Sequence, residues 1–124
     1  MVERVVVPVL DEKGEAAKLS PHFGRAPFFA VAEIHPNGRI ENLSFQPNRS
    51  EHFGGGGRPP DIILAFKPNV VITFGMGPRA MRRFQAVGVA VMQATSETLG
   101  EVLFAFAQNE LNELTEGCRE ARHR

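Results

Sequence analysis

The residues best suited to chemistry in this chain are two histidines in glycine-containing loops. His22 lies in the segment Ser20-Pro-His-Phe-Gly-Arg25, and His52 precedes Phe53 and four consecutive glycines. A neutral imidazole is a common metal ligand, although many loop histidines are only solvated or hydrogen-bonded. A closed zinc site needs about four donors at typical spacings, and the chain has no C-x-x-C or H-E-x-x-H motif. The two histidines are therefore either solvated or hydrogen-bonded loop residues, or ligands of an open metal site that has few protein ligands.

Cys118 is the only cysteine, so no internal disulfide can form. Its thiol is equally compatible with an exposed reduced side chain and with a ligand to a soft metal. The amino-terminal residues lack the long apolar region of a signal peptide, and no apolar run approaches membrane-spanning length. We therefore expect a cytoplasmic protein that does not interact with a membrane.

A glycine-rich stretch, Gly54, Gly55, Gly56 and Gly57, is followed by Arg58 and two prolines. Four glycines are costly to order, and such a run can serve as a flexible linker. Alternatively, it leads into a helix, because proline is well accepted in a first helical turn. Free N–H groups at a helix start attract anions.

A second turn, Gly75-Met-Gly77-Pro-Arg79, also places glycines before a proline at a predicted helix start. This repetition favours the anion-binding interpretation of both stretches. Neither stretch is a Walker loop, since Gly-Lys-Ser/Thr is missing from both. Neither is a complete dinucleotide fingerprint.

The elements that must position these residues follow from apolar runs and from proline and glycine. Continuous β-branched runs predict buried strands, and 3.6-residue periodicity predicts helices. Ser96 is expected to cap the last helix, and Val87 to face inward on the helix before it. The predicted strands are 5–9, 28–34, 39–45, 70–74 and 89–92, and the predicted helices are 59–67, 79–87 and one that includes Leu99 to Phe106.

This order of elements predicts a three-layer α/β domain with a mostly parallel sheet. A turn at His35-Pro-Asn-Gly38 reverses the chain, and counting reversals places three loops at one sheet edge. They are the His22 loop, the His52 and glycine loop, and the turn at 75–78. Ligands of open α/β sheets bind beyond the carboxyl ends of the strands, so we expect the site there. His35 falls on the opposite edge.

Composition limits the function classes. Lys plus Arg and Asp plus Glu both number 14, which argues against a general nucleic-acid binder. No carboxylate pair or Ser-His-Asp set suggests acid–base or nucleophilic catalysis, so we expect no enzyme. The 124 residues fit one domain over 1–114, followed by a flexible polar tail over 115–124.

Several motifs together resemble the dinitrogenase iron–molybdenum cofactor biosynthesis family, which includes NifX, NafY and the C-terminal domain of NifB. They are the segment Ser20-x-His-Phe-Gly-Arg-Ala-x-Phe-Phe29, the glycine run after His52, the turn Gly75-Met-Gly-Pro-Arg-Ala80 and the strand that follows Gly88. The resemblance covers residues 5 to about 114. It implies an RNase H-like fold with strand order 3-2-1-4-5 and strand two antiparallel.

The resemblance also implies binding or carriage of an iron–sulfur or iron–molybdenum-type cluster without catalysis, with cluster donor and acceptor proteins as partners. Such clusters are anionic, so Arg25, Arg58, Arg79 and the amides of Gly24, the glycine run, Gly75 and Gly77 are expected to hold the charge. His22, His52 and Cys118 are the candidate ligands. The alternative is a binding module for a small phosphorylated or nucleotide-like metabolite that uses the same glycine loops.

Overall fold

The computed structural model describes residues 1–50 and 55–114. His52, Gly54, Cys118 and the predicted tail at 115–124 lie outside the described residues. The elements, in chain order, are β1 (Glu3–Val9), the 3₁₀ helix η1 (Gly14–Ala16), β2 (Phe28–Ile34), β3 (Ile40–Pro47), α1 (Pro59–Leu64), β4 (Val70–Thr73), α2 (Pro78–Ala86), β5 (Ala90–Gln93) and α3 (Leu99–Ala107).

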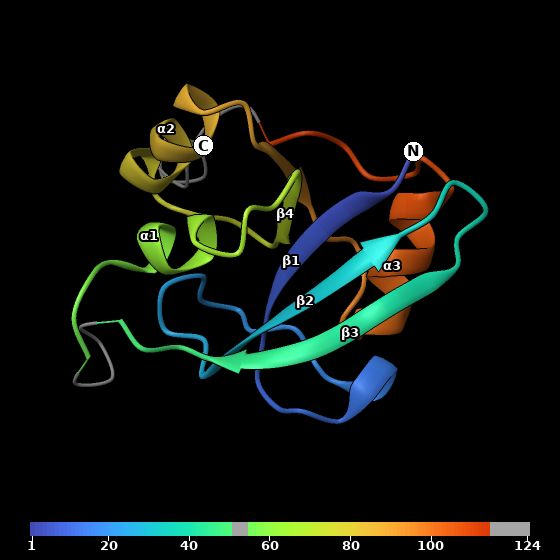
Figure 1. Ribbon diagram of the computed structural model, residues 1–124, viewed down its shortest axis with the longest axis horizontal. Helices are drawn as coiled ribbons and strands as arrows, with labels where there is room; N and C mark the ends of the chain where they lie inside the picture. Colours follow the sequence, from blue (N-terminus) through green and yellow to red (C-terminus); the bar gives the residue numbers. More distant parts are fainter. Residues whose placement is uncertain (51–54, 115–124) are drawn as a thin grey trace.

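The five strands form one mixed sheet in the order β3-β2-β1-β4-β5 (Figure 1). Strand β2 runs antiparallel to both β1 and β3, whereas β4 runs parallel to β1 and β5. A tight turn joins β2 to β3, in which the N–H of Gly38 donates to the carbonyl of His35 at 2.8 Å. The parallel strands are connected through helices, as parallel pairing requires. The predicted strand order and the antiparallel second strand are confirmed.

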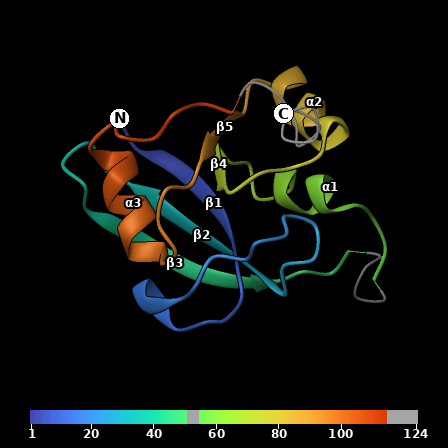
Figure 2. The ribbon, with the colours of Figure 1, turned by 180° about the vertical axis from the view of Figure 1, so that it is seen from behind.

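The sheet is covered on both faces, which makes three layers (Figures 1 and 2). Val5, Val7 and Val9 of β1 pack into the cluster that contains the buried residues of α3. Val6 points to the other face, into the cluster formed with α1 and α2. This alternation is the strand period of two, and it explains why a continuous valine run is needed in a strand that is buried on both faces.

The start of α3 differs from the prediction. Thr98, not Ser96, occupies the N-cap position, with φ −111° and ψ 151°. Ser96 lies in a bend two residues earlier, and the residues after it pair with a segment far away in the chain. Within this pairing, the N–H of Leu19 donates to Glu97 and the N–H of Leu99 donates to Ala17, both at 2.8 Å. Long-range backbone pairing therefore overrides the local capping preference.

The end of α2 also differs, because Val87 does not face inward. The helix ends at Ala86 and buries Met81 and Phe84, while Val87 leaves the helical conformation and is 60% exposed. Gly88 has φ +77°, the left-handed conformation of a residue that follows a helix, so its predicted role as helix stop is confirmed. Among the described residues, no helix combines the length and apolar character that crossing a membrane would require.

Candidate functional site

The His22 loop and the turn at 75–77 line one cavity at the predicted edge of the sheet. Its volume is about 320 Å³. His22 and Arg25 are exposed beside it, and both glycines of the turn, Gly75 and Gly77, contribute to its wall. The residues that line it are Pro21, His22, Phe23, Gly24, Arg25, Gly75, Met76 and Gly77. The structure therefore brings together two of the three loops that the reversal count placed at this edge.

Ser20 shapes the backbone around His22. Its hydroxyl accepts a hydrogen bond from the His22 N–H at 3.2 Å and donates to the His22 carbonyl at 2.8 Å. Ser20 is 3% exposed, and its own N–H donates to Pro8 of β1 at 3.0 Å. This local turn closed by a serine hydroxyl attaches the loop to the end of β1. The His22 backbone is thus held while its imidazole faces solvent.

The turn at 75–77 is anchored by two buried residues. Thr73, at the end of β4, is 1% exposed, and its hydroxyl donates to the Gly75 carbonyl at 3.2 Å. Met76 is 2% exposed and packs into the core between β1 and α2. Gly77 then forms the N-cap of α2, and no side chain caps that end. Pro78 has no N–H, so in this first turn the N–H groups of Arg79 and Ala80 are the ones without a partner inside the helix.

Asn48 joins the loop after β3 to the His22 loop. Its side-chain amide is buried and donates to the carbonyls of Gly24 at 3.1 Å and Ala26 at 2.8 Å. Its side-chain oxygen accepts the N–H of Ser50 at 3.0 Å. The sequence alone does not distinguish Asn48, because an asparagine after a strand is an ordinary turn residue. Its bond to the N–H two residues later is typical of such turns.

The described part of the glycine run forms a turn that needs glycine at two positions. A Cβ on Gly55 would collide with the carbonyl oxygen of Arg49, and Gly57 has φ +93°. Gly56 meets nothing within 4 Å. The N–H of Gly55 donates to the Ser50 carbonyl at 3.1 Å. The backbone therefore uses these glycines, which favours a shaped loop over a linker.

The three predicted arginines border this edge in two places. Arg25 lies at the smaller cavity. Arg58, at the N-cap of α1, and Arg79, in the first turn of α2, line a larger groove of about 730 Å³ between these helices. Phe23 lines both hollows. The two hollows are therefore neighbours that share one aromatic wall.

The predicted ligand set is only partly placed. His22 lies at the smaller cavity, whereas His52 and Cys118 lie outside the described residues. In residues 1–50 and 55–114, no three His, Cys, Asp or Glu side chains are grouped closely enough to hold a metal ion. His22 is thus the one candidate ligand whose surroundings can be described.

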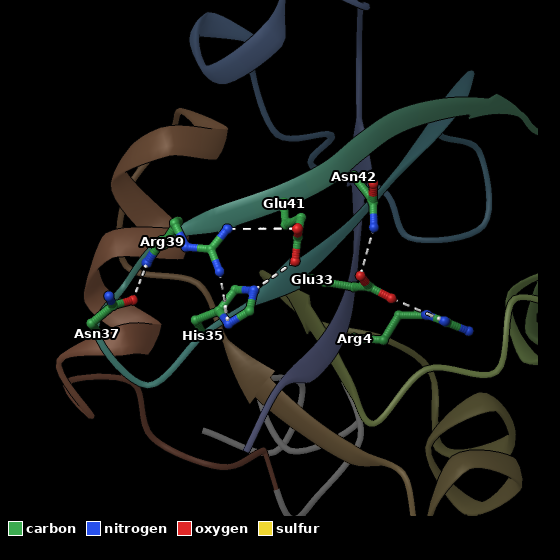
Figure 3. A network of polar contacts seen from close by, with 7 residues as sticks. All are labelled: Arg4, Glu33, His35, Asn37, Arg39, Glu41 and Asn42. Atoms are coloured by element: carbon green, nitrogen blue, oxygen red, sulfur yellow. Dashed lines mark hydrogen bonds and ion pairs between the residues drawn. The ribbon is translucent and has the colours of Figure 1, made fainter.

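His35 lies at the opposite end of the sheet, in a polar network on the β2–β3 hairpin (Figure 3). It interacts with Glu41 at 2.7 Å, and Arg39 approaches its other ring nitrogen at 3.4 Å. Hydrogen bonding to His35, then the charge of Arg39, lowers the pKa of Glu41. His35 is therefore paired within the hairpin, and it is separate from the candidate site.

A second pair of contacts extends this network to β1. Glu33 accepts hydrogen bonds from Asn42 at 2.8 Å and from Arg4 at 3.1 Å. These two hydrogen bonds, in that order, lower the pKa of Glu33. The network thus supports the β1–β2–β3 part of the sheet.

The fold and this edge define a class of protein: a small α/β domain with a five-stranded mixed sheet and polar loops gathered beyond the carboxyl ends of its strands. A family model described as dinitrogenase iron-molybdenum cofactor matches residues 4–109. The chain belongs to this family, and the resemblance drawn from its motifs is confirmed.

Individual proteins are similar to this chain in sequence or in fold. The uncharacterized protein MJ0580 of Methanocaldococcus jannaschii is 32% identical over 96 residues, which cover 76% of this chain and 80% of that protein. The crystal structure of PH0822 is similar with a TM-score of 0.75 and 27% identity, covering 90% of this chain and 96% of that one. The apo form of the orange protein from Desulfovibrio gigas has the same fold, with a TM-score of 0.77, 20% identity, and coverage of 93% and 95%.

Proposed function

We propose that this chain is a non-catalytic protein that binds and releases an iron–sulfur or iron–molybdenum-type cluster, or its precursor. Its family is associated with the iron–molybdenum cofactor. The observation that carries the proposal is the joint lining of one cavity by His22, Arg25 and the turn at 75–77. An imidazole, a guanidinium and the glycine backbone of the turn thus border the same space.

This combination suits an anionic cluster that must later leave. The Arg25 guanidinium and the backbone amides of the turn at 75–77 would stabilise negative charge without forming a bond to the metal. His22 would supply one exchangeable ligand. A complete set of protein ligands would hold the cluster too firmly for transfer, so few ligands are an advantage in a carrier.

His52 and Cys118 remain proposed ligands that would add to His22. His52 follows Asn48 by four residues in the sequence, and a cysteine thiolate is a preferred ligand of iron–sulfur clusters. The expected partners are proteins that deliver the cluster and accept it, in the cytoplasm. Cluster transfer between such partners requires ligand exchange and no acid–base or nucleophilic step.

Anaerobic reconstitution with iron and sulfide tests the proposal. The wild-type protein should develop visible absorption bands and retain stoichiometric iron after desalting. His22→Ala should retain less cluster and release it faster to a chelator, whereas His35→Ala, on the opposite edge, should behave as wild type. Failure of the wild-type protein to retain a cluster, or of a purified cofactor precursor to bind it, would contradict the proposed function.

A further inference from the structure

The groove between α1 and α2 is a second hollow, larger than the cavity at His22. Its volume of about 730 Å³ lies within the range of about 300–1,000 Å³ that is usual for small-molecule pockets. Two short helices form its sides, and these helices lie next to each other in both ribbon views (Figures 1 and 2). Its charged lining residues are Arg58, Arg79, Arg82 and Arg83.

The groove carries an excess of positive charge. Four guanidinium groups line it. In residues 1–50 and 55–114, the one carboxylate paired with them is Asp61, which forms an ion pair with Arg83 across the two helices. Four positive charges and one negative charge leave an excess of three. Arg79 and Arg82 are exposed and form no ion pair with the described residues. Guanidinium groups at this density match a ligand with several negatively charged oxygens, because their paired N–H donors bind phosphate in a bidentate manner.

The remainder of the lining is apolar. Phe23, Leu64 and Val87 contribute large side chains, together with two prolines and two alanines. Val87 is 60% exposed, so its side chain is available to a ligand in the groove. Phe23 is held in place by Phe84, whose ring meets it edge-on. A ligand that fills this groove would therefore need an apolar or flat body beside its negative charges.

We propose that the groove between α1 and α2 binds a phosphorylated small molecule with an apolar or aromatic body, of the class of nucleoside polyphosphates. Arg58, Arg79 and Arg82 would contact the phosphate oxygens, and Phe23 and Val87 would contact the body. An acidic peptide could satisfy the arginines as well, but the hollow shape and the apolar lining favour the small molecule. This inference concerns a different hollow from the proposed cluster site and stands without it.

Binding of a fluorescent ATP analogue tests the inference. The chain has no tryptophan or tyrosine, so the protein contributes little background emission. The wild-type protein should bind the analogue saturably, and unlabelled ATP should displace it. Arg82→Gln should weaken binding about tenfold, since it removes one charge-assisted contact. Arg39→Gln, on the opposite edge, is the matched control and should bind as wild type.

Val87→Ser tests the apolar part of the groove. It should weaken ATP binding and leave displacement by inorganic tripolyphosphate unchanged, because tripolyphosphate has no body to contact Val87. Equal affinities of Arg82→Gln and Arg39→Gln would overturn the assignment of the site. Binding of a hexaglutamate peptide that excludes ATP would overturn the ligand class and indicate an acidic protein partner. Equal effects of Val87→Ser on both probes would overturn the role of the apolar lining.

Discussion

Phe23 meets Phe84 edge-on, with ring centroids 5.9 Å apart and ring planes at 90°. Phe23 follows His22 in the loop after β1, and Phe84 is a fully buried residue of α2. Perpendicular aromatic pairs of this kind are favourable beyond the area that they bury. The contact fastens the loop of the proposed cluster site to α2, which carries three of the four groove arginines. The two hollows therefore share one structural support.

Removing this support should destabilise the whole domain. Phe23→Ala should lower the free energy of unfolding by about 3–5 kcal/mol, the usual cost of deleting a buried phenylalanine side chain. Urea denaturation followed by circular dichroism measures the change. Phe104→Ala is the control, because Phe104 is 65% exposed, and its effect should stay within about 0.5 kcal/mol. Equal effects of the two substitutions on the free energy of unfolding would show that the aromatic pair contributes little to stability.

Asn48 should be needed for stability through its amide group. Asn48→Ala should cost about 1–3 kcal/mol, because it removes the donors that serve the carbonyls of Gly24 and Ala26. Asn48→Asp should be no better, since a carboxylate placed against two carbonyls has no donor to offer. The exposed Asn112 provides a control as Asn112→Ala. If Asn48→Asp were as stable as wild type in thermal unfolding, the proposed donor role would be wrong.

The described glycines of the loop before α1 should differ in their tolerance of a side chain. Gly55→Ala should destabilise the protein by at least about 1 kcal/mol, because its Cβ would collide with the Arg49 carbonyl. Gly57→Ala should also be unfavourable, by about 1–2 kcal/mol, since its φ is +93°. Gly56→Ala is the matched control, with open space around its Cβ. Equal melting temperatures for Gly55→Ala and Gly56→Ala would contradict the described loop.

The hairpin network should make stability depend on acid pH. The pKa values of Glu33 and Glu41 are lower in the folded protein than their ordinary value of 4.5. A lowered pKa means that the unfolded chain binds more protons, so stability falls as pH falls. The contribution is complete above pH 4.5 and is lost as the pH drops through the folded-state values. Denaturation midpoints measured from pH 7 down to acid pH should show this loss.

Glu41→Gln isolates one carboxylate of the network. It should reduce the acid-dependent loss of stability, because a glutamine at this position does not titrate. Glu12→Gln is the control, since Glu12 is exposed and has no side-chain hydrogen bond within the described ranges. An acid profile of Glu41→Gln that overlays the wild-type profile would show that the contact with His35 contributes nothing to stability.

Much of the architecture could be predicted from the sequence because its signals are local. The β-branched run at 5–9 predicts a strand buried on both faces, and its five residues are buried in the structure. The turn at His35 to Gly38 reverses the chain as expected. With these reversals counted, the strand directions and the meeting of the His22 loop with the turn at 75–77 follow from chain direction. The strand order was implied by the family resemblance, and the structure confirms it. The family motifs lie in the same loops.

Other features could not be predicted, because they depend on residues far apart in the chain. Serine is a common helix cap, which is why Ser96 was expected at the N-cap of α3. The residues that follow it pair instead with the chain near Leu19, and this moves the start of the helix. Asn48 became important only when folding placed its amide against two carbonyls more than 20 residues away. Arg82 and Val87 line the large groove because α1 packs beside α2 and α2 ends at Ala86.

Strand identity and direction were determined by the sequence, since backbone preference acts locally. The buried partners and the shape of both hollows were decided by tertiary packing, since they depend on which distant surfaces exclude water together.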